Sequence, residues 1–223
     1  MKFGINANSV IYYRAKEYAM YIDEDGYIFD DRIERKIFKK IEKGNLDKVN
    51  GIVVHQTDSS SAQSTFNSYD NTSANGAHFL IDKDGKVYQT ASLLKTTWHV
   101  GLMQSKCILK KTCQPTETSL LALHRGGAWG ATTAKQISDL EKEKSFPNRF
   151  PGNTDSIGIE IVGRAVGPKN KEVYEAVTEK QNESLKWLIS EIASKFNVPM
   201  TEVYRHPDIG RKNKTEASTA KWE

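Results

Sequence analysis

Two histidines, each at the end of an apolar run, are the residues of this chain best suited to chemistry. His55 ends the run 51–55, His206 ends the run 203–206, and Glu216 follows in the loop after His206. Two imidazoles and one carboxylate can hold a zinc ion with one position open for water, whose pKa then falls to about 7. A histidine after a strand is more often structural than a ligand, so it is the combination with Glu216 that favours a metal site.

Glu160 and Lys214 are two further candidates. Glu160 interrupts the apolar run 156–162, so on a strand it points away from the face that holds Ile159 and Ile161. If its own face lines a cleft, Glu160 is suited to act as general base; otherwise it faces solvent. Lys214 is suited to stabilise the oxyanion of a hydrolysed amide, or it is an ordinary solvated lysine.

The elements that must position these residues are strands and one strong helix. We expect a buried strand at 51–55, a hairpin formed by 77–81 and 86–89, a strand at 156–162 and a short strand at 203–204. A capping box at 178–181 begins a helix whose apolar positions continue to Phe196. This pattern predicts an α/β fold with a central mixed sheet flanked by helices.

Three further segments complete the expected organisation. Residues 1–48 are predicted to be an N-terminal appendage that packs on a main domain at 49–223. Within it, a hairpin turns at 23–26 and a helix starts near Asp31, with apolar positions at Ile33, Ile37, Phe38 and Ile41. A loop with a short helix is expected at 57–75, and an irregular insertion at about 102–155.

Composition limits the classes of protein to which the chain can belong. Its 223 residues carry a net charge of +4 with interspersed charges, which suits a soluble domain and makes a nucleic-acid partner improbable. The first residues contain no secretory signal, and no segment is long enough to span a bilayer. Synthesis in the cytoplasm is therefore expected. Cys107 and Cys113 are either free thiols or a local disulfide.

Four ordered motifs resemble the zinc-dependent N-acetylmuramoyl-L-alanine amidases, the group of phage amidase-type lysozymes, cell-wall recycling amidases and peptidoglycan recognition proteins. They are IVVHQT (52–57), AHFLIDKDG (77–85) with WHVG (98–101), SIGIE (156–160), and HPDI through KTE (206–216). The likeness covers roughly residues 51–222.

The resemblance implies His55, His206 and Glu216 as Zn²⁺ ligands in a surface groove. It also implies Glu160 as catalytic acid/base and Lys214 as oxyanion stabiliser. The family usually has Asp or Cys where this chain has Glu216, so Asp208 is a reserve ligand. Phage members carry a tyrosine at the place of Ala77, which fits the branch that uses Glu160.

The other aromatic and imidazole side chains of interest are assigned to substrate contact or to packing. Trp98 and His99 are predicted to contact sugar or peptide, although Trp98 suits packing equally well. His78 is predicted to be structural. Trp129 and His124 either contact substrate or, as we favour, pack inside the insertion.

The implied reaction is hydrolysis of the amide between the lactyl group of N-acetylmuramic acid and L-alanine. We favour a lytic role, as a phage lysis enzyme or a delivered antibacterial toxin that acts on the cell wall after non-standard export or lysis. A delivered toxin would have an inhibitor protein as partner, and the enzyme is expected to be a monomer. The alternatives are a non-catalytic peptidoglycan-recognition module, which the Glu216 substitution favours, and a cytosolic muropeptide recycling amidase.

Overall fold

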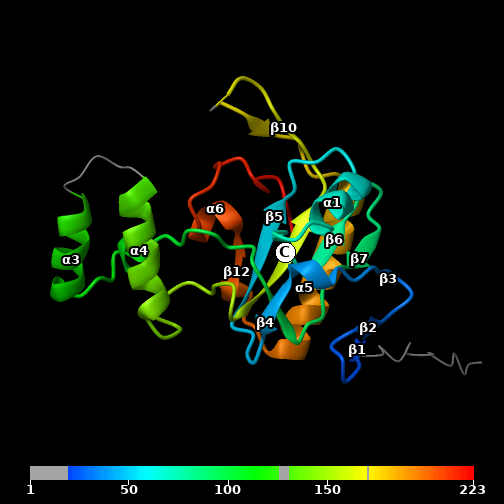
Figure 1. Cartoon of the computed structure of the whole chain (residues 1–223), viewed down its shortest axis with the longest axis horizontal. Helices are drawn as coiled ribbons and strands as arrows, with labels where there is room; N and C mark the ends of the chain where they lie inside the picture. Colours follow the sequence, from blue (N-terminus) through cyan, green and yellow to red (C-terminus); the bar gives the residue numbers. More distant parts are fainter. Residues whose placement is uncertain (1–19, 126–130, 170) are drawn as a thin grey trace, which may run out of the picture.

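The fold is built on one mixed sheet (Figure 1). The computed structural model describes residues 20–125, 131–169 and 171–223. Its six-stranded sheet has the order β12 (Val203–Arg205), β5 (Gly51–Gln56), β9 (Ser156–Ile161), β6 (Phe79–Ile81), β7 (Val87–Gln89) and β3 (Ile33–Arg35). Neighbouring strands are parallel except for the hairpin β6–β7. The predicted α/β class, the strands and the hairpin are confirmed.

One face of the sheet is covered by α5 (Glu179–Phe196). The predicted capping box is present, since the Thr178 side chain accepts from the backbone of Gln181 and the Gln181 side chain accepts from the backbone of Thr178. The helix ends at Phe196, and the left-handed conformation of Asn197 caps its last turn. Four fully buried residues of its apolar face enter the main core, namely Leu185, Leu188, Ile189 and Ile192.

Side-chain alternation sends different residues to the opposite face. On β5, Ile52 and Val54 pack in the core under α5, whereas Val53 belongs to a second apolar cluster. His55 follows Val53 on that second face, because side chains two positions apart share a face of a strand. The expected helix at 57–75 is α1 (Ala62–Tyr69). It packs on the face of the sheet that carries His55, where Phe66 of the helix joins Leu80 of β6 in one apolar cluster.

Residues 20–48 are joined to the sheet through strands. A predicted hairpin is present as β1 (Tyr21–Ile22) and β2 (Ile28–Phe29), followed by β3. The helix predicted from Asp31 is wrong: β3 pairs with β7, and after a single 3-10 turn, η1 (Lys39–Ile41), β4 (Glu42–Asn45) pairs with β8 (Lys95–Thr97). The helical spacing of the apolar residues gave the wrong prediction, because Ile33 and Ile41 are buried in different clusters and not along one helix face. The division of the chain at residues 48 and 49 stays a prediction.

The segment 102–155 contains helices, so the expectation of an irregular insertion is wrong. It forms α2 (Lys106–Lys110), α3 (Pro115–Arg125) and α4 (Ala131–Glu143), which extend to one side of the sheet (Figure 1). They enclose a small core of their own, with Cys107, Leu121 and Ile137. Because these apolar positions are few and widely spaced, the sequence shows only a weak helical pattern. The placement of Trp129 and of the His124 side chain lies outside the described part of the chain.

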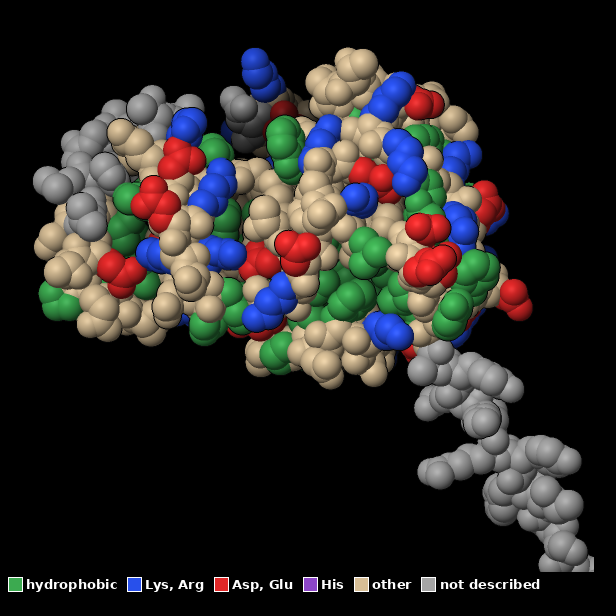
Figure 2. All heavy atoms as spheres, turned by 60° about the horizontal axis from the view of Figure 1, so that its bottom comes forward, with side chains coloured by type: hydrophobic (Ala, Val, Ile, Leu, Met, Phe, Trp, Pro, Cys, Tyr) green, Lys and Arg blue, Asp and Glu red, His purple; other side chains and the backbone are tan. Residues whose placement is uncertain are grey.

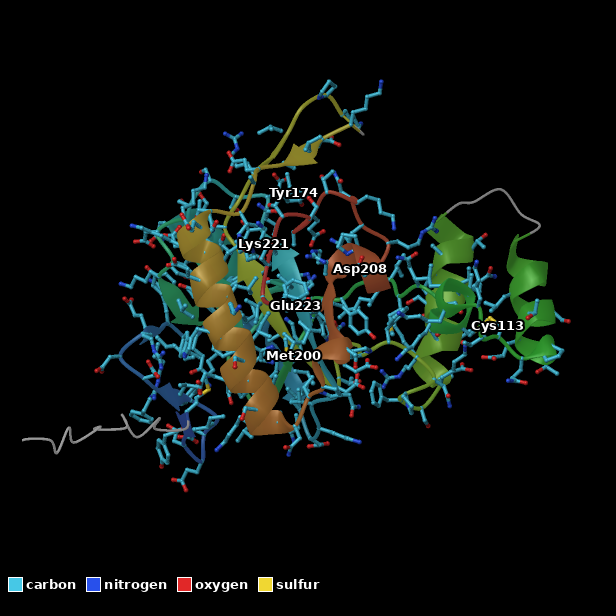
Figure 3. All side chains as sticks on the ribbon, turned by 180° about the vertical axis from the view of Figure 1, so that it is seen from behind. Cys113, Tyr174, Met200, Asp208, Lys221 and Glu223 are labelled. Carbon is cyan, nitrogen blue, oxygen red and sulfur yellow. A yellow bond between two sulfur atoms is a disulfide. The ribbon has the colours of Figure 1, made fainter. Side chains whose placement is uncertain are left out.

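Cys107 and Cys113 form a disulfide within this helical insertion. Figure 3 places Cys113 beside the helices and away from the sheet. A disulfide that closes so short a loop removes chain entropy from the unfolded state worth about 2 kcal/mol.

We therefore expect the double variant Cys107→Ala/Cys113→Ala to lose about 2 kcal/mol in the free energy of unfolding, measured by urea titration. The residues carried by the sheet should be unaffected, because the disulfide lies in the helical insertion, away from the sheet. An unchanged free energy of unfolding would show that the disulfide leaves the unfolded ensemble unrestricted.

One face of the described part of the chain carries mixed charges (Figure 2). Over the face seen in Figure 2, basic and acidic side chains alternate rather than gather. Within the described residues, no helix combines the length and apolar character needed to cross a membrane.

Candidate active site

Adjacent parallel strands bring the two predicted imidazoles together. His55 lies near the end of β5, and His206 begins α6 (His206–Ile209) directly after β12. The two strands are parallel with Arg205 paired to Val54, so both chains leave the sheet at the same edge. Residues 151 positions apart in the sequence therefore become neighbours.

Glu216 reaches the same point from the loop after α6. The Asn213 side chain accepts hydrogen bonds from the backbone and hydroxyl of Thr215, which tightens the turn before Glu216. The Gln56 side chain then accepts from the backbone of Ala217 at 3.1 Å and ties the loop to β5. The extra methylene of glutamate thus does not prevent contact. Asp208, the reserve ligand, is exposed and accepts from the backbone of Arg205 instead.

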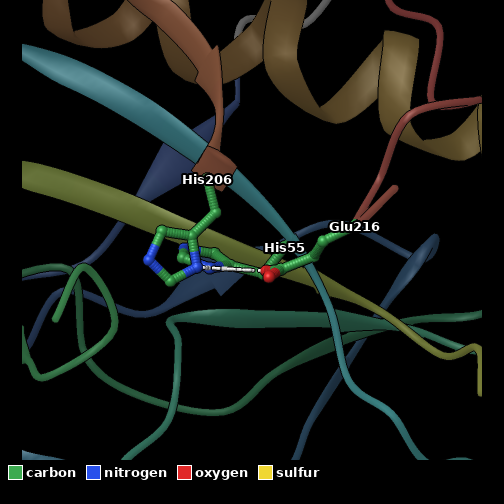
Figure 4. Close-up of side chains that lie close together, drawn as sticks. All are labelled: His55, His206 and Glu216. Atoms are coloured by element: carbon green, nitrogen blue, oxygen red, sulfur yellow. Dashed lines mark hydrogen bonds and ion pairs between the residues drawn. The ribbon is translucent and has the colours of Figure 1, made fainter. Parts of the chain in front are cut away.

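The three side chains form a buried cluster (Figure 4). His206 Nδ1 lies 2.8 Å from His55 Nδ1 and 3.0 Å from Glu216 Oε1, and His55 Nδ1 lies 3.6 Å from the same oxygen. One potential ligand atom from each residue lies within 4.8 Å of the others. Among the described residues, this is the one group of three or more His, Cys, Asp or Glu side chains with such spacing.

The donor set fits a divalent metal ion. Burial lowers the pKa of His55 to about 4. Burial raises the pKa of Glu216, but hydrogen bonding with His206 and His55 outweighs it and lowers the value to about 2. Neutral imidazole and ionised carboxylate are the forms that bind zinc. Lone pairs that face one another at these distances repel, so either a proton on one of the ring nitrogens or a metal ion must separate them.

Glu160 lies beside the cluster, on β9. It is paired in register with His55, so both side chains are on the face of the sheet opposite α5. Its Oε2 is buried and has no hydrogen-bond partner. Burial raises the pKa of Glu160 to about 8, and the nearby carboxylate of Glu216 adds to the effect. The solvent-facing alternative for Glu160 is therefore wrong.

These groups line a pocket of about 570 Å³. Trp98 stands at its rim with 55% of its surface exposed. His99 also borders the pocket but is buried behind His55, with Nδ1 2.9 Å from His55 Nε2. His78 is structural, as predicted: its Nδ1 accepts from the backbone of Gly158 and its Nε2 bonds to the Lys95 carbonyl.

The structure separates the two lysines of the last loop. Lys214 has an exposed side chain whose Nζ donates to the carbonyl of Pro207 at 3.4 Å, and it is not among the lining residues. Lys212 does line the pocket, and its charge acts on Glu160. Sequence reasoning missed Lys212 because one basic residue in a basic loop carries no distinguishing signal.

Tyr174 is a second lining residue that the sequence did not single out. It ends a short hairpin of β10 (Ala165–Val166) and β11 (Val173–Tyr174), and its backbone N–H donates to Thr215 Oγ1 at 3.1 Å. Figure 3 shows Tyr174 at the base of this hairpin, next to the loop that leads to Glu216. The sequence did not indicate this hairpin, because strands of two residues are too short to show a periodic pattern.

An α/β sheet with a buried His-His-Glu cluster and a nearby carboxylate defines the class of hydrolases suited to a catalytic metal. The profile of the N-acetylmuramoyl-L-alanine amidase family matches residues 45–218. The chain belongs to this family, and membership indicates amidase activity on peptidoglycan.

Solved structures similar to this chain are known at low sequence identity, and the first of those named here shares its fold. A selenomethionine derivative of AmpD is 17% identical, with 91% of this chain and 96% of that one covered and a TM-score of 0.52. AmpDh3 from Pseudomonas aeruginosa, in complex with anhydromuramic pentapeptide, is 19% identical, with 87% and 60% covered and a TM-score of 0.48. A mutant endolysin from Bacillus subtilis is 19% identical, with 78% and 82% covered and a TM-score of 0.44. Curated proteins show no match to this chain.

Proposed function

We propose that this protein is a zinc-dependent N-acetylmuramoyl-L-alanine amidase that cleaves the bond between the lactyl group of N-acetylmuramic acid and L-alanine. The observation that carries the proposal is the cluster itself: three ligand atoms from distant segments converge beside Glu160 at an open pocket. The family match supports the bond that is cleaved.

His55, His206 and Glu216 would hold the ion, which when bound supplies an acidified water and polarises the scissile carbonyl. Glu160 then accepts the proton of the attacking water and returns it to the departing L-alanine nitrogen. Its raised pKa suits both transfers, because a group with a pKa near the working pH gives and takes protons readily. The exposed face of Trp98 is suited to stack on a sugar ring or peptide.

Lys214 is proposed to stabilise the oxyanion, since its 3.4 Å hydrogen bond to Pro207 is weak enough to exchange for a substrate oxygen. We expect Lys214→Ala to lower kcat by about 10²–10³-fold, measured by release of stem peptide. Lys212→Ala is the matched control. A large loss in Lys212→Ala with little in Lys214→Ala would transfer the role to the lysine that lines the pocket.

The biological role that we propose is lytic, on intact wall rather than on recycled fragments. The disulfide within the insertion supports action in an oxidising space outside the cytoplasm. If the enzyme is a delivered toxin, the producing cell would require an inhibitor protein. We also propose that the enzyme is a monomer. The non-catalytic alternative had rested on the Glu216 substitution, but Glu216 lies 3.0 Å from His206 and so completes the cluster.

The test is to incubate the zinc-loaded protein with purified sacculi and, separately, with soluble anhydro-muropeptides. Mass spectrometry should detect free stem peptides that begin at L-alanine, and chelation of the metal should stop their release. Cleavage of soluble fragments alone would favour recycling. A zinc-loaded protein that releases no such peptide from either substrate would refute the proposed reaction.

A further inference from the structure

Both imidazoles of the cluster turn their second ring nitrogen toward one short segment. His55 Nε2 lies 2.9 Å from His99 Nδ1, and His206 Nε2 lies 2.7 Å from the carbonyl oxygen of Val100. Two consecutive residues between β8 and α2 therefore provide the outer hydrogen-bond partner of each proposed histidine ligand. Both His99 and Val100 are buried, which limits competition from water for these bonds.

The donor and acceptor of each hydrogen bond between Ser156, His99 and His55 can be assigned by starting from the carbonyl group of Gly152. Ser156 Oγ lies 2.6 Å from the carbonyl oxygen of Gly152, which can only accept, so the hydroxyl donates there. His99 Nε2, 3.3 Å from Ser156 Oγ, must then be the donor of that contact. His99 Nδ1 consequently carries the lone pair that accepts from His55 Nε2–H.

The same reasoning assigns the proton of His206 to Nε2, because the carbonyl oxygen of Val100 can only accept. Both proposed ligands thus carry their proton on Nε2 and present the lone pair of Nδ1 toward Glu216. This is the arrangement in which an outer partner sets the tautomer and orientation of a ligating imidazole.

Asn153, in the turn that leads into β9, holds the segment in place. Its Oδ1 accepts from the backbone N–H of His99 at 3.0 Å and from that of Val100 at 2.8 Å. One side chain therefore fixes both outer partners. Gly158 makes room for the ring of His99, because a Cβ at that position would lie 2.8 Å from His99 Cγ and Nδ1.

We propose that His99 and Asn153 are positioning residues for the metal ligands. His99 acts on His55 through Nδ1, and Asn153 acts on both histidines by fixing the 99–100 backbone. The inference rests on the proposed zinc chemistry. It gives His99 a role different from the substrate contact expected from sequence. Loss of such an outer partner typically weakens metal binding by about 10–100-fold.

Two substitutions at His99 separate hydrogen bonding from packing. His99→Asn places an amide oxygen near the position of Nδ1 and can still accept from His55, whereas His99→Leu fills the space with no acceptor. We expect His99→Leu to raise the zinc Kd by about 10–100-fold and His99→Asn to stay within a few-fold of wild type. The Kd is measured by competition with a chromogenic chelator, and the Tm of the metal-free protein reports any structural loss.

Asn153 provides an independent pair. Asn153→Asp keeps an acceptor for the two N–H groups and should keep the zinc Kd, whereas Asn153→Ala should raise it. Cobalt-substituted protein adds a second readout, since the visible spectrum reports ligand geometry and should change in His99→Leu and Asn153→Ala only.

The outcomes distinguish this inference from the proposed function. Wild-type protein that binds no zinc would overturn both. Wild-type protein that binds zinc, together with unchanged Kd and cobalt spectra in His99→Leu and Asn153→Ala, would overturn the inference alone. A His99→Asn Kd as weak as that of His99→Leu, with the metal-free Tm retained, would also overturn it.

Discussion

Glu160→Gln is expected to lower kcat by about 10²–10⁴-fold, the usual contribution of a positioned general acid/base. Glutamine preserves the size of the side chain but can neither accept nor return a proton. Glu160 is not one of the three clustered residues that could bind the ion. The variant should therefore still contain about one zinc per chain by metal analysis. Release of stem peptides from sacculi provides the measurement of kcat.

The pH profile supplies a control for this variant. The carboxyl group of Glu160 must be ionised to accept a proton, so kcat/KM should rise with pH as it ionises. Burial raises its pKa to about 8 without a metal, and the positive charge of a bound ion would move the rise to lower pH. The rise should vanish in Glu160→Gln. A variant that keeps both its rate and its rising limb would remove Glu160 from the mechanism.

Glu216→Ala is expected to have the second large effect, loss of the metal and with it of hydrolysis. Removal of a carboxylate ligand should raise the zinc Kd by more than about 100-fold, the upper range for loss of an outer partner. The carboxylate oxygen that lies 3.0 Å from His206 Nδ1 would be gone, leaving two imidazoles. Equilibrium dialysis against a chelator measures the Kd, and the sacculus assay measures activity.

Glu216→Asp is the matched control, because it keeps the charge and shortens the reach by one methylene. It should bind zinc more tightly than Glu216→Ala and retain part of the activity. Full zinc occupancy and full activity in Glu216→Ala would show that a different group completes the coordination.

Five of the six strands of the sheet could be predicted, because each is a short apolar run, as at 51–55; the segment of β3 was predicted as a helix instead. The helix α5 could be predicted because its cap and its apolar face agree. The prediction of His55, His206 and Glu216 as zinc ligands depended on motifs, since no spacing rule in the sequence states that β12 lies beside β5. The pairing register of His55 with Glu160 is likewise a property of the folded sheet.

What escaped prediction is tertiary in origin. Ile33 and Ile41 have helical spacing, yet pairing of β3 with β7 separates them. His99 reads as a groove residue, but whether a side chain faces substrate or another imidazole depends on the loop that Asn153 fixes. Lys212 and Lys214 are equivalent by composition, and only the loop geometry distinguishes them.

The register of β5 and β9 carries a consequence for how the enzyme can diversify. His55 and Glu160 are held at a fixed separation by backbone pairing, and a slip of one residue would turn Glu160 to the face covered by α5. Trp98, Tyr174 and the helical insertion lie on connections outside this framework. Exchange of those connections between relatives can therefore change which wall polymer is bound, while His55 and Glu160 keep their spacing. Chimeras in which these loops are exchanged should combine the chemistry of the parent that provides the sheet with the substrate preference of the parent that provides the loops.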